Sequence, residues 1–112
     1  MKVIILGVDG MLGHKIAQTL QTKFTLICSS RKNINLDDFG IFNSLLIKID
    51  FIKDNFIKII DKIDFDIIIN CTGVTSRRGI NDNFENAKFI NSELPRKLTQ
   101  LVIKRDKKLI HF

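Results

Sequence analysis

Short apolar runs alternate along the chain with stretches in which apolar residues recur at helical spacing. The runs are rich in β-branched residues and cover 2–6, 24–28, 45–49, 65–71 and 108–112. Helical spacing begins near residues 12, 53 and 84, and the polar segment after the second run predicts a loop with a short helical turn. Three consecutive isoleucines, Ile67 to Ile69, are typical of a parallel strand that is covered on both faces.

The first apolar run leads directly into a glycine-rich turn that opens the first helix. Its glycines, Gly7, Gly10 and Gly13, have the spacing G-x-x-G-x-x-G. In such a unit the first glycine permits a tight turn, the second lets the backbone approach a pyrophosphate, and the third lets the helix pack closely. The N–H groups of Met11 and Leu12 would then face the anion, with the helix dipole behind them. The unit predicts a dinucleotide phosphate site, and a glycine turn without a ligand is the alternative.

Strands that alternate with helices predict right-handed β-α-β units. With the glycine turn they predict an α/β fold of the Rossmann type, a doubly wound parallel sheet of about five strands in the order 3-2-1-4-5. The 112 residues are one domain or part of one.

Pro95 interrupts the last helical segment. Because proline donates no N–H, the Asn91 carbonyl loses its helical partner, which predicts a kink and an available acceptor.

The segment after the second strand carries Ser30, Arg31 and Lys32 and no acidic residue. In this fold an acid at this place binds the ribose 2′-hydroxyl of NAD, whereas a basic residue accommodates the 2′-phosphate of NADP. The planar guanidinium of Arg31 therefore favours NADP, with NAD as the alternative. An exposed basic loop without a ligand is the other interpretation. After the third strand, Asp50 is expected to bind the adenine amino group, to cap the next helix, or both.

The fourth strand runs into Thr72 and Gly73, at the carboxyl edge where ligands bind in such sheets. Arg77 and Arg78, in the following loop 74–83, either meet a second phosphate-bearing ligand or lie in solvent. The long helical pattern from residue 84 to about 104 then leads to the last apolar run.

Composition excludes several other classes. The net charge of +6 is spread along the chain, and the dense cluster 104–108 falls at a predicted helix end, so we expect no nucleic-acid partner. No apolar run has the length of a membrane span, and glycines interrupt any signal-peptide core, so the default location is the cytoplasm. Cys28 and Cys71 are expected to be buried free thiols, and no metal-ligand spacing occurs.

Several segments together resemble the extended short-chain dehydrogenase/reductases, and among them the dTDP-4-dehydrorhamnose reductase group of nucleotide-sugar reductases. The segments that carry the resemblance are Gly7-Val8-Asp9-Gly10-Met11-Leu12-Gly13-His14-Lys15, Asp66-Ile67-Ile68-Ile69-Asn70-Cys71-Thr72-Gly73, Ile90-Asn91-Ser92-Glu93-Leu94-Pro95-Arg96-Lys97-Leu98 and Leu109-Ile110-His111-Phe112. The resemblance covers the whole chain. Their order along the chain is more specific than any single segment.

The resemblance implies NAD(P)-dependent reduction of a keto-deoxysugar attached to a nucleoside diphosphate, in surface polysaccharide synthesis. It assigns the pyrophosphate to the glycine turn and the nicotinamide path to the end of the fourth strand. The cofactor-binding residues it implies are Gly7, Gly10, Met11, Leu12, Gly13, Ser30, Arg31, Asp50, Phe51, Cys71, Thr72 and Gly73. Ser30 and Arg31 would hold the adenosine end, and Asp50 and Phe51 the adenine. Asn91 matches a helix asparagine that assists a water-mediated proton relay in some relatives.

The chain also departs from the family pattern. It contains no tyrosine, although the family protonates its substrate through a Tyr-x-x-x-Lys pair, so none of the 112 residues is assigned a catalytic role. We therefore expect residues 1–112 to be the N-terminal, cofactor-binding portion of a reductase, inactive alone. A non-catalytic NADP-binding regulator and a decayed gene fragment are the alternatives. Asp9 places a carboxylate near the pyrophosphate, and an open apolar edge at Leu109 and Ile110 favours pairing with a second copy.

Overall fold

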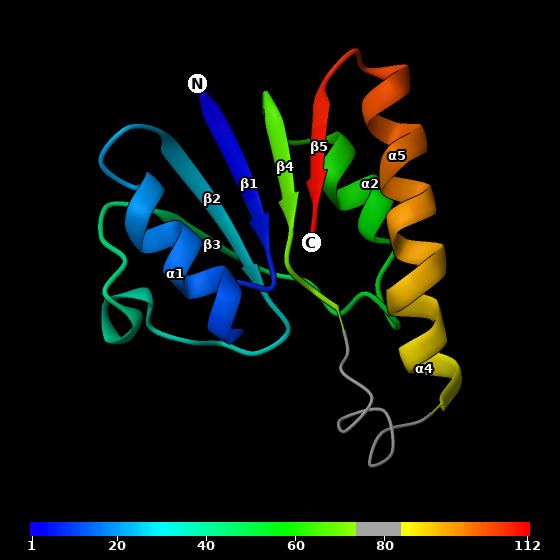
Figure 1. Ribbon diagram of the computed structural model, residues 1–112, viewed down its shortest axis with the longest axis horizontal. Coiled ribbons are helices and arrows are strands. Elements are labelled where there is room, and N and C mark those ends of the chain that lie inside the picture. The colour runs from blue at the N-terminus through cyan, green and yellow to red at the C-terminus, as the bar shows by residue number, and fades with distance from the viewer. Residues whose placement is uncertain (74–83) are drawn as a thin grey trace.

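A computed structural model describes residues 1–73 and 84–112 (Figure 1). Its strands are β1 (Lys2–Leu6), β2 (Thr25–Ser30), β3 (Leu45–Lys48), β4 (Ile67–Asn70) and β5 (Lys108–His111). Its helices are α1 (Met11–Leu20), α2 (Phe56–Asp61), α4 (Phe84–Lys88) and α5 (Leu94–Lys104), with a 3-10 turn η1 (Leu36–Phe39) and a π-helical turn η2 (Phe89–Glu93). The predicted loop 74–83, with Arg77 and Arg78, lies outside the described residues.

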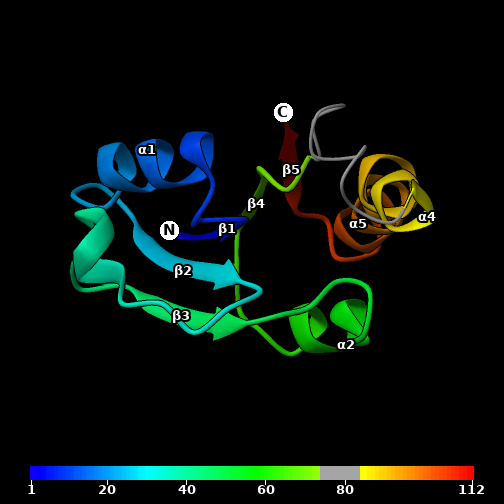
Figure 2. The same cartoon turned by 90° about the horizontal axis from the view of Figure 1, so that it is seen from below.

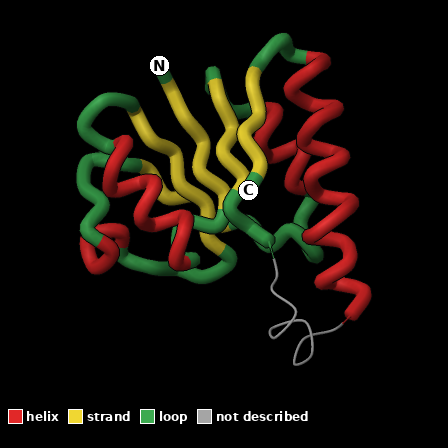
Figure 3. The backbone as a smooth tube through the Cα atoms, viewed as in Figure 1, coloured by secondary structure: helices red, strands yellow, loops and turns green. Residues whose placement is uncertain are grey.

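The described strands form one parallel sheet in the order β3-β2-β1-β4-β5, which confirms the predicted fold class. Helices α2 and α5 cover one face of this sheet, and α1 and η1 lie on the other, as Figures 1 and 2 show together, while α4 extends past the carboxyl ends of the strands. The carboxyl ends of the strands point toward one edge of the sheet (Figure 3), where the chain leaves β1, β2 and β4 for its loops. The topology therefore gathers the predicted site residues at a single edge.

Alternate side chains of the central strand, β1, belong to two separate hydrophobic cores. Ile4 and Leu6 pack with α2 and α5, whereas Val3 and Ile5 pack with α1 and η1. This explains why the strand is apolar at consecutive positions, since both of its faces are covered. The buried residues of α1, Gly13 and Ala17, are small, which lets the helix lie close to the sheet, and Ile16 and Leu20 pack beside them.

Two details of the helices differ from the sequence-based expectation. The helix expected from residue 53 begins at Phe56, and its N-terminus is capped by the Asn55 side chain, which accepts a hydrogen bond from the Lys58 N–H (3.3 Å). The long helix is not simply kinked at Pro95. It widens into the π-turn η2, in which the Leu94 N–H donates to the Phe89 carbonyl, and the proline then occupies the first turn of α5. Proline is tolerated in the first turn of a helix, because the backbone N–H that it lacks would have no helical partner at that position.

The basic cluster at the end of α5 has a structural role that periodicity alone does not reveal. The Arg105 guanidinium donates to the carbonyls of Asp61 (3.2 Å) and Ile63 (3.0 Å), at the end of α2, and lies 4.4 Å from the ring centroid of Phe65. A cation at these carbonyls satisfies groups that a helix C-terminus leaves unpaired. The expectation that this cluster only complements its own helix is therefore incomplete.

Strand β5 forms one edge of the described sheet, as expected. Ile110 and Phe112 are 45% and 58% exposed, and with Ile16, Leu20 and Ile69 they line a shallow apolar groove on the side of α1. Among the helices of residues 1–73 and 84–112, none is long and apolar enough to cross a membrane.

Candidate functional site

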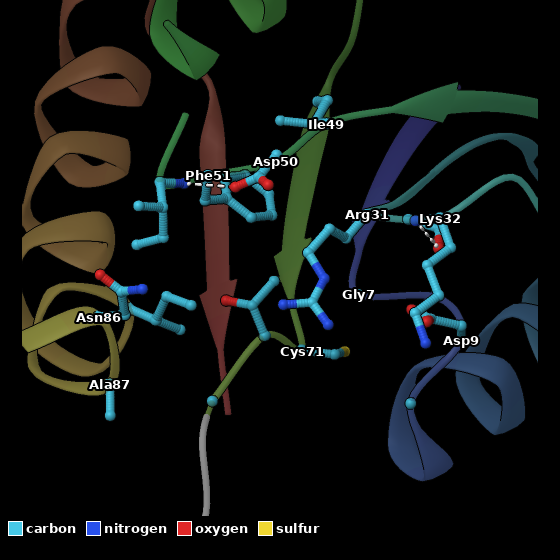
Figure 4. Close-up of a pocket in the computed structure, with 16 residues that line it drawn as sticks. Gly7, Asp9, Arg31, Lys32, Ile49, Asp50, Phe51, Cys71, Asn86 and Ala87 are labelled. Carbon is cyan, nitrogen blue, oxygen red and sulfur yellow. Dashed lines mark hydrogen bonds between the residues drawn. The ribbon is translucent and has the colours of Figure 1, made fainter. Parts of the chain in front are cut away.

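A pocket of about 320 Å³ opens at the carboxyl ends of the strands (Figure 4). Its walls come from the turn after β1, the ends of β2, β3 and β4, and one face of α4. The lining residues are Gly7, Asp9, Gly10, Ser30, Arg31, Lys32, Ile49, Asp50, Phe51, Ile52, Cys71, Thr72, Gly73, Asn86, Ala87 and Ile90. This is the place at which open α/β sheets bind ligands.

Glycine is present at the three positions of the turn for different structural reasons. Gly7 has a φ of +77°, and an added Cβ would lie 2.9 Å from the Cys71 carbonyl oxygen. A Cβ on Gly13 would lie 2.1 Å from the Gly7 carbonyl oxygen, so the contact between helix and turn excludes any side chain. At Gly10 the nearest atom would be that same oxygen at 3.4 Å, an ordinary distance. Two of the glycines are thus required by packing, whereas Gly10 keeps its surface toward the pocket open.

The N-terminus of α1 faces this region without a side-chain cap. Its N-cap is Gly10, no acidic residue lies in the first turn, and within residues 1–73 and 84–112 no side-chain hydrogen bond caps the helix. The first N–H groups of a helix have no partner within it, so those of Met11 and Leu12 remain available to an anion. The side chains of Met11 and Leu12 are 83% and 46% exposed and do not line the pocket. Gly13 lies behind them, against Gly7.

Basic side chains form the wall at the end of β2. Arg31 extends across the middle of the pocket toward Cys71 in Figure 4, and Lys32 lies on the side of Asp9. The Ser30 hydroxyl oxygen accepts a hydrogen bond from the Lys32 N–H (3.2 Å), which fixes the bend after the strand. The site thus presents two cations and, in Asp9 and Asp50, two carboxylates.

The opposite wall at the end of β3 is organised by Asp50. Its Oδ1 accepts hydrogen bonds from the N–H groups of Ile52 (3.0 Å) and Lys53 (3.2 Å), while its own N–H donates to Asp54 Oδ2 (2.8 Å). These bonds close a turn before α2, so the expectation that Asp50 caps the helix is wrong, because Asn55 does so. The neighbouring Phe51 lines the pocket and packs edge-on against Phe56, with ring centroids 5.4 Å apart.

The third wall joins the end of β4 to α4. Cys71 is partly buried, and burial raises the pKa of its thiol to about 11. Asn86, Ala87 and Ile90 face the pocket from the helix, and sequence analysis did not assign them. Ile90 lies three positions after Ala87 and four after Asn86, which puts it on the same helix face as each of them, and this spacing was the only signal in the sequence. The Asn91 Oδ1 lies 3.9 Å from the position of a Cβ on Gly73, so the π-turn brings this side chain near the pocket wall.

The structure therefore gathers most of the predicted residues around one pocket: Gly7, Gly10, Ser30, Arg31, Asp50, Phe51, Cys71, Thr72 and Gly73. Met11, Leu12 and Gly13 lie outside its lining. Both cysteines, Cys28 and Cys71, are free thiols, and burial raises the pKa of Cys28 to about 12.

Comparisons with known proteins agree with this architecture. A family model described as the RmlD substrate binding domain matches residues 1–112. The probable low-salt glycan biosynthesis reductase Agl14 of Haloferax volcanii is 25% identical over 113 residues, which are 100% of this chain and 36% of that protein.

Solved structures share the fold. The PbgP3 protein from Burkholderia pseudomallei has a TM-score of 0.76 at 17% identity, covering 98% of this chain and 34% of that one. A mutant UDP-glucuronic acid 4-epimerase from Bacillus cereus, in complex with a UDP sugar and NAD, has a TM-score of 0.73 at 16% identity, covering 99% of this chain and 39% of that one. The chain thus spans little more than a third of the length of these relatives. Because the family model matches the whole chain, the protein belongs to the RmlD substrate binding domain family, that of the dTDP-4-dehydrorhamnose reductases.

Proposed function

We propose that residues 1–112 form the cofactor-binding domain of an NAD(P)-dependent reductase that acts on a nucleotide-linked keto-deoxysugar in glycan biosynthesis. The observation that carries the proposal is the contact between Gly7 and Gly13, which brings the uncapped start of α1 to the mouth of a pocket along the carboxyl ends of the strands. In this arrangement the pyrophosphate lies against Gly10 and the N–H groups of Met11 and Leu12. The nicotinamide end extends toward Cys71, Thr72 and Gly73.

The relatives support the class of reaction. The Haloferax volcanii relative is named a glycan biosynthesis reductase, and the Bacillus cereus epimerase was solved with NAD. In this proposal the chain supplies binding and orientation of the dinucleotide. When bound, the dinucleotide supplies the hydride for a carbonyl group, and the general acid is not assigned to any residue of this chain, which contains no tyrosine.

We propose NADP as the preferred cofactor. Arg31 and Lys32 line the pocket where the adenosine ribose would lie, and no acidic residue follows β2 there. A guanidinium binds a phosphate through charge-assisted hydrogen bonds, whereas an acid would repel it. Asp50 and Phe51 lie further along the same wall, next to the proposed adenine position.

Fluorescence titration of the protein with NADPH and NADH tests both parts of the proposal. Wild type is expected to bind NADPH more tightly, and Arg31→Ala is expected to weaken NADPH by about 10- to 150-fold while leaving NADH nearly unchanged, since a charged hydrogen bond contributes about 1.5–3 kcal/mol. Lys15→Ala, on the exposed side of α1 and outside the pocket lining, is the matched charge control. An NADH preference would overturn the assignment of NADP, and binding of neither dinucleotide would overturn the proposed site.

A further inference from the structure

We propose that Asn70 is a positioning residue for this pocket. Through one buried amide it turns the Thr72 hydroxyl into a group that only accepts hydrogen bonds from a ligand, and it holds His111 in the tautomer protonated on Nε2. The part that concerns the ligand rests on the proposed dinucleotide site. The part that concerns His111 does not.

Asn70 occupies the carboxyl end of β4, next to the pocket but not in its lining. Its side chain is fully buried, with 0% of the residue exposed, and it lies opposite His111 in the register of β4 with β5. A buried amide is costly unless its donors and its acceptor are satisfied. The partners of Asn70 come from two directions: Thr72, two residues later, lies at its Oδ1, and His111, across the strand pair, lies at its Nδ2.

The orientation of the amide follows from the backbone. The Thr72 N–H donates to Asn70 Oδ1 at 3.2 Å. A backbone N–H cannot accept, so the atom that faces it must be the amide oxygen and not the nitrogen. This argument fixes both ends of the Asn70 side chain, because the nitrogen must then face the other partner.

The same oxygen determines what the Thr72 hydroxyl can do. Thr72 Oγ1 lies 2.6 Å from Asn70 Oδ1, and because Oδ1 only accepts, the hydroxyl must donate its single proton there. Thr72 also lines the pocket. Toward a ligand its oxygen therefore has only lone pairs to offer, which selects a hydroxyl or an amide N–H at that point and disfavours an anionic oxygen. In a bound dinucleotide, a ribose hydroxyl or the carboxamide N–H has this chemistry.

The nitrogen of the amide determines the state of His111. Asn70 Nδ2 lies 2.9 Å from His111 Nδ1, and since an amide nitrogen only donates, Nδ1 must accept. A neutral imidazole that accepts at Nδ1 carries its proton on Nε2. The hydrogen bond between Asn70 and His111 also joins the last residue of β5 to the end of β4, just before the chain continues to Gly73 in the pocket wall.

Nuclear magnetic resonance of the unliganded protein tests the tautomer independently of any cofactor. The ¹⁵N shifts of His111, recorded where the imidazole is neutral, are expected to show protonation at Nε2. Asn70→Asp removes the donor that faces Nδ1 but keeps an oxygen toward Thr72, so protonation is expected to move to Nδ1. Wild-type His111 protonated on Nδ1 would overturn the inference, and this measurement stands even if the variant does not fold.

Titration with NADPH tests the acceptor role of Thr72. Thr72→Val keeps the shape of the side chain and is expected to weaken binding by about fivefold, the usual effect of one hydrogen bond. Thr72→Ser is expected to restore most of that loss. The control is Thr99→Val, which removes a hydroxyl bonded to the Pro95 carbonyl on the exposed face of α5. Unchanged affinity of Thr72→Val, with NADPH still bound by wild type, would refute the role of Thr72 and leave the proposed function standing.

Discussion

Replacing Gly13 by alanine separates the packing role of the glycine turn from helix propensity. Alanine in place of glycine in a helix normally stabilises by about 1 kcal/mol. Here the new Cβ would lie 2.1 Å from the Gly7 carbonyl oxygen and 3.0 Å from its carbon. Both atoms belong to the backbone, so no side chain can rotate away to make room. The steric effect should therefore reverse the sign that propensity predicts.

The Gly7 carbonyl is itself held in place. It accepts the Gly10 N–H at 3.1 Å, and Gly7 has a left-handed φ next to the Cys71 carbonyl. Overpacking costs about 1–3 kcal/mol and more where the backbone must move. Taking about 3 kcal/mol and subtracting the gain in propensity leaves a net loss of about 2 kcal/mol. For 112 residues this lowers Tm by about 8 °C.

Thermal and urea unfolding followed by circular dichroism measure this loss. Gly10→Ala is the matched control, because Gly10 has a φ of −75° and its added Cβ meets nothing closer than 3.4 Å. We expect its Tm to fall much less than that of Gly13→Ala, because alanine is only a poorer N-cap than glycine there, while its affinity for NADPH falls, since the methyl group would lie against the pyrophosphate. A Gly13→Ala variant as stable as wild type would refute the reasoning about the turn.

Three further perturbations have defined outcomes. Ser29→Ala should raise the free energy of unfolding by about 1 kcal/mol in urea titrations, because the Ser29 hydroxyl is buried and has no hydrogen-bond partner within residues 1–73 and 84–112. At pH 8 Cys71 should react with iodoacetamide about 100-fold more slowly than an ordinary thiol, since burial raises its pKa to about 11. The reaction rate should rise with pH until the pH reaches this pKa. Bound NADPH should slow the reaction further. Asp9→Asn should tighten NADPH binding about threefold at low salt, and the gain should shrink at 0.5 M salt. No change at low salt would mean that the Asp9 carboxylate points away from the phosphates.

Much of the sheet could be predicted because local pattern and burial agree. A strand covered on both faces must be apolar at consecutive positions, and Val3 to Leu6 show this directly. The glycine turn was equally readable, since the packing of Gly13 on Gly7 leaves no room for a side chain. The carboxyl ends of parallel strands meet at one edge, so the loops after β2, β3 and β4 could be assigned to one site before their contacts were known.

The features that could not be predicted depend on alternatives between which the sequence alone does not decide. Asp50 and Asn55 are both good helix caps, and only the turn that Asp50 closes decides between them. The π-turn before Pro95 accommodates the missing donor by widening the helix, where the proline had predicted a kink. Arg105 bonds carbonyls more than forty positions earlier, a contact that only the packing of α5 beside α2 creates.

The central claim is that the start of α1 binds the pyrophosphate of a dinucleotide. Amide chemical shifts recorded during an NADPH titration test it most directly. The account predicts that the largest, saturable shifts occur at Gly10, Met11 and Leu12, with smaller ones at Arg31 and Thr72. If the amides at the start of α1 do not shift at high NADPH concentration, the claim is contradicted, whether NADPH then binds elsewhere on the protein or not at all.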